Sequence, residues 1–260
     1  SNPYSKGPRV LSYKGLPFSG ELVEYFDDEK TQLKERIDYR EGKIDGKYEE
    51  YNKNGQLEES VTYKEGIKNG ISEEYNFKTV DVGFDSDEGV IITEEIPYLR
   101  IKQYYKDGKL NGPYVRYYDD EEIVEKVTYI NGKKEGFEEN FWPGGDIYHK
   151  VNYINGNREG SYLEYHSNDS INIKTTYKRG KLDGPYEEYH RNGQLEKKST
   201  VKDGVYDGSY EEYYENGQLT MKYTFKDGKL NGPYVKYYEN GQLKIKTNYK
   251  VGYKKGVYEE

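Results

Sequence analysis

The residue types that most often carry chemistry are few in this sequence. It contains no cysteine, which excludes disulfides, thiolate metal sites and a thiol nucleophile. Of its three histidines, His166 and His190 lie 24 residues apart at equivalent places in two similar segments. If each segment is a hairpin, the two rings lie roughly 10 Å apart. That separation is too large for both to bind one metal at about 2.1 Å. We therefore expect structural histidines and no cofactor.

Paired carboxylates are the other candidates for chemistry. Glycoside hydrolysis, for example, needs two carboxylates with unequal environments in one cleft. Here the Glu-Glu pairs recur in almost every similar segment, and neighbouring residues of a strand point to opposite faces. We expect structural columns of carboxylates and a protein that is not an enzyme. The pairs are Glu49-Glu50, Glu73-Glu74, Glu138-Glu139, Glu187-Glu188, Glu211-Glu212 and Glu259-Glu260.

The composition favours strands and a fold with much surface. Hydrophobic residues make up 33% of the chain and charged residues 34%, but aromatic residues reach 16%, with 33 tyrosines. Disordered chains are poor in aromatic residues. A tyrosine ring covers apolar surface while its hydroxyl stays in water. Alanine is absent and glycine occurs 29 times. Because alanine favours helices and tyrosine favours strands, we expect an all-β protein with tight turns.

Glycines mark an internal repeat of 24 residues. A first series continues at the same spacing from Gly112, after an 18-residue insertion beyond Gly70. A second glycine precedes each marker by four residues, and a third follows it by nine in the best copies, always after asparagine. The markers are Gly20, Gly46, Gly70, Gly112, Gly136, Gly160, Gly184, Gly208, Gly232 and Gly256. The third glycines are Gly55, Gly193, Gly217 and Gly241.

Each period predicts one β-hairpin. Asn-Gly between strand-like segments indicates a type I′ turn, in which both central residues have positive φ. In the second strand of one copy, Leu57, Val61 and Tyr63 are spaced as one half-buried face. In the first strand of another, Tyr186 and Tyr189 are three apart. Either both faces carry tyrosine there or a bulge realigns the two side chains.

Stacking supplies the pairing and shared core that one hairpin lacks. The sequence therefore predicts an elongated, single-layer antiparallel sheet of tandem hairpins over residues 20–260. Residues 1–19 are expected to cap one end. The insertion at 77–100 is expected to be a lengthened hairpin, serving either as part of a binding face or as a tolerated loop. An open sheet edge also leaves an edge-to-edge homodimer as an alternative.

The repeats resemble the bacterial variant of the MORN repeat. The resemblance rests on segments such as Tyr-Lys-Arg-Gly-Lys-Leu-Asp-Gly-Pro-Tyr-Glu-Glu-Tyr at 177–189 and Glu-Asn-Gly-Gln-Leu at 215–219, and covers the chain from about Gly20 onward. It implies antiparallel hairpins laid side by side. Bacterial chains of this kind are often labelled antitoxins or immunity-type partners of toxins, and some occur on the cell envelope. Tyr-Glu-Glu-Tyr replaces the Gly- and Trp-rich segment of eukaryotic relatives, so their lipid binding does not carry over.

Charge and tyrosine point to a protein partner. The net charge is −8, with glutamate concentrated in the first strands and lysine near the glycine turns. An acidic, tyrosine-rich strip would attract a basic partner, and tyrosine is frequent in binding hot spots. Net acidity argues against nucleic acid and anionic lipid. The candidate partner-binding residues are Tyr165, Tyr189, Tyr213, Tyr237, Glu188 and Glu212.

The first functional hypothesis is therefore a protein-binding scaffold, with neutralisation of a basic toxin as its most specific form. The alternative is a cell-envelope structural or adhesive array that binds glycan or matrix, because tyrosine rings also stack on sugars. The sequence leaves the localisation open between the bacterial cytoplasm and the cell envelope. It does not identify the partner or the face of the sheet that binds it.

Overall fold

The computed structural model describes residues 10–85 and 90–255, and these residues form strands and turns but no helix. The chain divides into two units, residues 1–133 and 134–260. Two short strands, β1 (Ser12–Tyr13) and β2 (Leu16–Pro17), precede the repeats. The remaining strands of the first unit are β3 (Gly20–Tyr25), β4 (Leu33–Arg40), β5 (Lys43–Tyr51), β6 (Leu57–Lys64), β7 (Ile67–Asp85), β8 (Val90–Lys106), β9 (Lys109–Tyr117) and β10 (Ile123–Ile130). Those of the second are β11 (Lys133–Phe141), β12 (Ile147–Ile154), β13 (Asn157–Tyr165), β14 (Ile171–Lys178), β15 (Lys181–Tyr189), β16 (Leu195–Lys202), β17 (Val205–Tyr213), β18 (Leu219–Lys226), β19 (Lys229–Tyr237), β20 (Leu243–Lys250) and β21 (Tyr253–Lys254).

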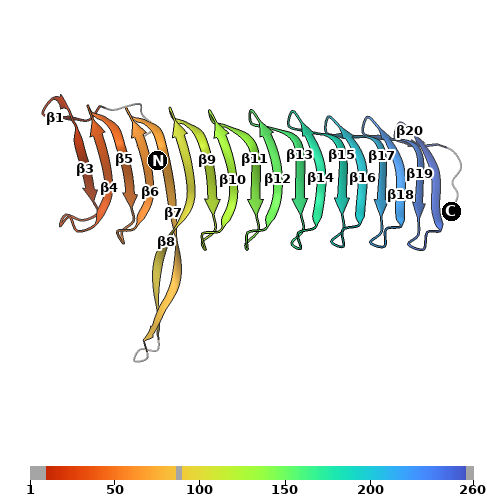
Figure 1. The fold of residues 1–260 in the computed structure, drawn as a ribbon, viewed down its shortest axis with the longest axis horizontal. Coiled ribbons are helices and arrows are strands. Elements are labelled where there is room, and N and C mark those ends of the chain that lie inside the picture. The colour runs from red at the N-terminus through yellow and green to blue at the C-terminus, as the bar shows by residue number, and fades with distance from the viewer. Residues whose placement is uncertain (1–9, 86–89, 256–260) are drawn as a thin grey trace. The chain divides into compact units, whose positions relative to one another are not determined.

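Within each unit every strand pairs antiparallel with the next one along the chain (Figure 1). In the first unit this pairing runs from β3 to β10, and in the second from β11 to β21. Each unit is one layer of strands. The predicted all-β fold of tandem antiparallel hairpins is confirmed. Of the predicted boundary features, Gly256, Glu259 and Glu260 lie outside the described residues.

The type I′ turn lies at the opposite end of the hairpin from the one we expected. At the turn between β14 and β15, Arg179 and Gly180 both have positive φ, 51° and 79°. This is the conformation that a two-residue type I′ turn requires. The same pair of positive φ values recurs at nearly every second-glycine turn, whatever residue precedes the glycine.

The Asn-Gly loops instead contain one left-handed residue. In the loop after β15 only Gly193 has positive φ, 81°, and its N–H donates to the His190 carbonyl over 2.8 Å. This is a turn followed by a left-handed glycine, the three-residue hairpin connection. Asn192 is needed for its side chain: its Oδ1 accepts from the Gln194 N–H, and its Nδ2 donates to the Glu215 carbonyl of the next repeat.

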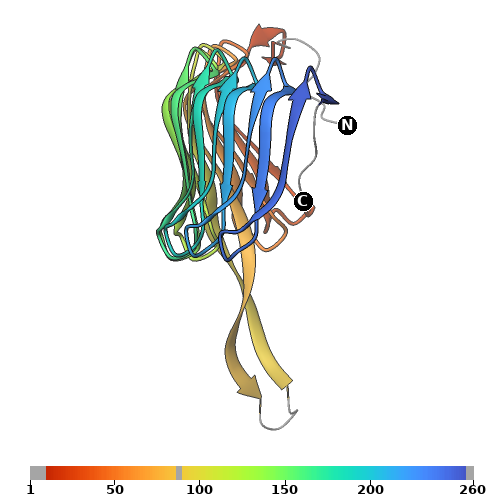
Figure 2. The same cartoon turned by 90° about the vertical axis from the view of Figure 1, so that its right-hand side faces the viewer.

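A bulge at each marker glycine bends the strands. Thr175 is paired with Tyr186 and Tyr177 with Leu182, so Thr176 alone stands opposite three residues of β15. Gly184 is the middle one of the three and has φ +128°. Six other hairpin junctions show the same shift. Bulges bend a strand and increase its twist, and Figure 2 shows the strands of the second unit bent along their length.

One face of each unit carries nearly all the buried side chains, and we call it the core face. Its central row follows the strand register. In the first unit the row consists of Leu22, Ile37, Tyr48, Val61, Ser72, Gln103, Tyr114 and Val127. In the second it consists of Glu138, Val151, Tyr162, Thr175, Tyr186, Ser199, Tyr210, Tyr223, Tyr234 and Thr247. Val61 and Val151 are at most 1% exposed.

Large and small side chains alternate along much of this row. Tyr186 stands between Thr175 and Ser199, so its ring lies over small neighbours. The exception is the run Tyr210, Tyr223 and Tyr234, whose rings stack with centroids 4.5 and 5.5 Å apart. Tyrosine rings thus provide the apolar cover that a second layer provides in other folds.

The predicted face of the second strand is partly wrong. Val61 and Tyr63 both belong to the core face, opposite Tyr48 and Gly46. A second bulge, however, places Leu57 opposite Tyr51. The extra residue of the bulge breaks the alternation of two, so Leu57 moves to the other face.

The insertion forms an arm that projects beyond the ends of the neighbouring strands (Figure 1). Strands β7 and β8 stay paired from Tyr75 opposite Leu99 out to Asp85 opposite Val90. The connection at residues 86–89 lies outside the described residues. At the start of the chain, the segment before β3 runs along the Gly42 turn, where the Leu11 N–H donates to the Gly42 carbonyl over 2.7 Å. The cap prediction for residues 1–9 also falls outside the described residues.

Replacing Gly184 with alanine should destabilise the protein by roughly 2–3 kcal/mol, because φ there is +128° and a methyl group would overlap the Thr176 hydroxyl. Gly193→Ala is the matched control, since φ is +81° but nothing lies within 4 Å, and it should cost only about 1 kcal/mol. Urea unfolding followed by circular dichroism measures both. Equal costs would contradict the role assigned to the bulge.

Stability should fall at high pH because buried tyrosines must stay protonated. Burial raises the pKa of Tyr63 to about 12, and that of Tyr186 to about 12, from an ordinary value of 10.0; nearby glutamates add to both shifts. The unfolded chain therefore loses these protons first. We expect a constant free energy of unfolding up to about pH 10 and a steep decline between about pH 10 and 12. Urea titrations across this range, with tyrosinate absorbance recorded, test this. A fold whose tyrosines all ionise near pH 10 would refute it.

Candidate binding surfaces

The face opposite the core face carries a row of lysines, and we call it the lysine face. In the second unit lysine occupies every second strand of this row, at 24-residue intervals. The row consists of Glu139, Lys150, Leu163, Lys174, Glu187, Lys198, Glu211, Lys222, Val235 and Lys246. Successive lysines are two strands apart, roughly 10 Å. Sequence reasoning missed this row and noted only lysines beside the glycine turns, although the 24-residue spacing was present.

The carboxylates of this row are held close to the sheet. Glu211 accepts from Lys222 Nζ and from the Tyr213 hydroxyl, both over 2.6 Å. These two donors, lysine first, hold the pKa of Glu211 below its usual value. Glu187 accepts from the Tyr189 hydroxyl over 2.9 Å. Lys198, in contrast, is exposed. The charges that a partner meets on this face are therefore mainly ammonium groups.

The tyrosines predicted to bind a partner lie beside the lysine row. Tyr165, Tyr189, Tyr213 and Tyr237 end their strands and stand opposite Ile171, Leu195, Leu219 and Leu243. All four tyrosines are half-buried. Burial, followed by the hydrogen bond to Glu211, raises the pKa of Tyr213 to about 12. The first unit continues the pattern with Tyr25, Tyr51, Tyr75 and Tyr117, opposite Leu33, Leu57, Leu99 and Ile123. We call these pairs the tyrosine row.

The predicted glutamates lie on the other side of the sheet. Glu188 accepts from Lys197 over 2.8 Å and from the Tyr186 hydroxyl over 3.5 Å, on the core face. Glu212 likewise accepts from the Tyr210 hydroxyl over 2.6 Å. The structure therefore does not bring Glu188 and Glu212 together with the tyrosine row. The reason is the alternation of side chains along a strand, which leaves Glu187 as the neighbour of Tyr189.

This arrangement also decides the alternatives for the first strand. Tyr186 bonds to Glu188 and Tyr189 bonds to Glu187, in each case across two positions of the same strand. Both faces therefore carry tyrosine. Each Glu-Glu pair of this kind is divided between the two faces, so its two carboxylates do not share a cleft.

Two of the histidines join neighbouring repeats. The Nε2 atom of His166 lies 2.8 Å from the Tyr189 carbonyl, and that of His190 lies 3.1 Å from the Tyr213 carbonyl. Tyr214, at the next equivalent position, donates its hydroxyl to the Tyr237 carbonyl over 3.1 Å. The shared hydrogen bond explains why histidine and tyrosine alternate in this column. Within residues 10–85 and 90–255, no group of three or more His, Asp or Glu residues could hold a metal ion.

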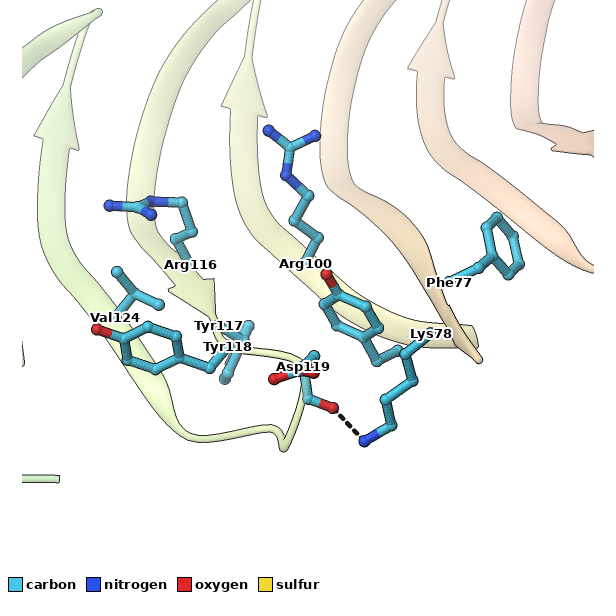
Figure 3. A pocket seen from close by; sticks show the side chains of 9 residues that line it. Phe77, Lys78, Arg100, Arg116, Tyr117, Tyr118, Asp119 and Val124 are labelled. Atoms are coloured by element: carbon cyan, nitrogen blue, oxygen red, sulfur yellow. Dashed lines mark hydrogen bonds between the residues drawn. The ribbon is translucent and has the colours of Figure 1, made fainter. Parts of the chain in front are cut away.

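A shallow pocket of about 340 Å³ lies where the arm leaves the sheet (Figure 3). The arm contributes Phe77, Lys78, Tyr98 and Arg100, and the following repeat contributes Arg116, Tyr117, Tyr118, Asp119 and Val124. Its cations are already engaged. Arg100 lies 2.7 Å from Glu74, Arg116 lies 3.3 Å from Glu125, and Lys78 donates to the Asp119 carbonyl. These contacts fix the base of the arm. No helix among the described residues has the length and apolar character needed to cross a membrane.

Comparison with known families agrees with this architecture. The MORN repeat variant matches residues 44–65, 110–131, 158–179, 182–203, 206–227 and 230–250, together slightly more than half of the chain. The unmatched repeats include the one with the arm and the one whose loop has Gly144-Gly145 in place of Asn-Gly. No curated protein matches the chain. The family is a structural repeat type, and on this match the chain belongs to the MORN repeat variant family.

Proposed function

We propose that the protein is a non-enzymatic scaffold that binds another protein on its lysine face. The observation that carries the proposal is the tyrosine row, which repeats the same Tyr–Leu or Tyr–Ile pair in hairpin after hairpin. Buried bonds to glutamate fix the rings, so binding would cost them little conformational entropy. Tyrosine is enriched in interface hot spots for this reason.

The charges beside this row favour an acidic partner surface. Lys174, Lys198 and Lys246 are exposed, while Glu187 and Glu211 accept hydrogen bonds from tyrosine hydroxyls. Complementary charge increases the rate of encounter and fixes the register of a complex. A partner for the lysine face therefore combines carboxylates with apolar side chains.

Toxin neutralisation is the most specific form of the proposal. A basic toxin would suit the net charge of −8. It would have to meet the core face, where Glu164, Glu188 and Glu212 lie, because lysines are the exposed charges beside the tyrosine row. A toxin bound on the lysine face would be acidic at its contact surface.

Glycan binding is a second candidate, favoured by one cluster of rings. On the core face of the second unit, Tyr206 stacks on Phe225 with centroids 5.2 Å apart, next to the stacked rings of Tyr210 and Tyr223. Tyr206 is 38% exposed. Flat rings of this kind suit a sugar ring, which fits a cell-envelope role.

The test uses tagged full-length protein carrying Tyr189→Ser, Tyr213→Ser and Tyr237→Ser together. Wild-type protein should recover a stoichiometric protein partner from its own cells, and the triple variant should bind that partner at least about tenfold more weakly. Tyr206→Ser, an exposed ring on the other face, is the control and should bind normally.

Circular dichroism first establishes that the triple variant is folded. If it is not, Lys174→Glu with Lys198→Glu tests the same face without disturbing the rings. Full binding by a folded variant of either kind would refute the proposal. Signals on a glycan array that Tyr206→Ser abolishes, with no protein recovered, would favour the second candidate.

A further inference from the structure

The tip of the arm exposes apolar side chains that no part of the fold requires. Val82, Phe84, Val90, Ile91 and Ile92 are each between 48% and 64% exposed. Phe84 and Ile91 are paired across the arm, so their side chains lie on the same side of it. Contiguous exposed apolar residues mark interaction sites. The tip therefore has the character of an inserted binding element.

The arm is also acidic. Asp81, Asp85, Glu94 and Glu95 lie along its described part, and no lysine or arginine occurs between Thr79 and Ile96. Asp81 and Glu94 are one step from the apolar tip in the pairing of β7 with β8. The arm thus presents carboxylates and apolar side chains together, the combination that the lysine face calls for.

The arm leaves the sheet from a fixed base. The Gln56 amide donates to the Glu95 carbonyl and Asn54 Nδ2 lies 3.4 Å from a Glu95 carboxylate oxygen, both from the preceding loop. Lys78 donates to the Asp119 carbonyl in the following loop. Because both neighbouring loops hold the base, the described part of the arm is presented as a rigid ribbon, which reduces the entropy lost on binding.

We infer that the arm of one copy docks on the lysine face of the second unit of another copy. The carboxylates Asp81, Asp85 and Glu94 would meet Lys174, Lys198 and Lys222, and Phe84 and Ile91 would lie against the tyrosine row. The lengths agree: seven arm residues at about 3.3 Å each span roughly 20 Å, and three successive lysines also span roughly 20 Å.

The core face is a poorer site for the same arm. Its row beside the central tyrosines contains Glu164, Glu188 and Glu212, which would repel the carboxylates of the arm. The inference rests on the lysine face being a binding surface, as the proposed function holds. It adds that a second copy competes with the partner for that face.

Sedimentation velocity of the purified full-length protein tests this inference at protein concentrations from about 1 to 300 μM. Wild-type protein should associate as its concentration rises. Phe84→Asp with Ile91→Asp should shift the association midpoint at least about tenfold, as should Lys174→Glu with Lys198→Glu and Lys222→Glu. Ile130→Asp is the control, because Ile130 is 51% exposed but lies outside both surfaces.

A charge exchange makes the test specific. An arm variant with Asp81→Lys, Asp85→Lys and Glu94→Lys should be monomeric alone, and so should the triple lysine-face variant. A mixture of the two should associate again, because the cationic arm now meets an acidic face. A monomeric wild-type protein at 300 μM (roughly the highest concentration above) would overturn the inference, as would association that survives in both variants.

These outcomes are separable from the proposed function. A monomeric wild-type protein whose partner binding still depends on Tyr189, Tyr213 and Tyr237 would remove the second copy and leave the scaffold. Self-association through the arm without any partner dependence on the tyrosines would do the reverse.

Discussion

Hydrogen bonding between neighbouring hairpins is the constraint on which the rest of the structure depends. One 24-residue hairpin has no second layer to cover its apolar face, so each repeat is stabilised by its neighbours. The ties occur at both ends of the strands. At one end Asn192 donates to the Glu215 carbonyl of the next repeat. At the other, the Gly204 N–H donates to the Leu182 carbonyl, and Asp183 accepts from the Asp203 N–H. A constant period is required because each tie reaches a fixed place in the following hairpin.

The same constraint produces the two faces. With an even period and side chains that alternate along each strand, a residue type at one position recurs on one face in every repeat. Val151, Thr175 and Ser199 form part of the covered row, and Lys150, Lys174 and Lys198, each one residue earlier, form the exposed lysine row. The bulge at the marker glycine bends every strand at the same height, so it does not disturb this sorting. Burial and charge are thereby separated across a layer only one strand thick.

How far the sequence could predict the molecule follows from this geometry. Glycine spacing predicted the hairpins and their antiparallel order, because turns need residues that tolerate positive φ. It did not predict which turn was of type I′, since Arg179 and Val251 adopt positive φ beside a glycine as readily as asparagine does. The face of Leu57 and the division of Glu188 from Tyr189 were missed for one reason. Both depend on bulges and strand register, which composition and spacing do not reveal, whereas the tyrosines themselves were identified correctly as one column.

The central claim is that the two faces differ along every strand, and thiol labelling tests it most directly because the natural sequence has no cysteine. Single cysteines at 198, 199, 200 and 201 sample one strand, where Ser199 is 3% and Val201 5% exposed and Lys198 and Thr200 are exposed. The structure predicts labelling at least about tenfold faster at 198 and 200 than at 199 and 201, because protection follows burial. Equal rates at all four positions, or fast labelling at 199 and 201, would contradict it.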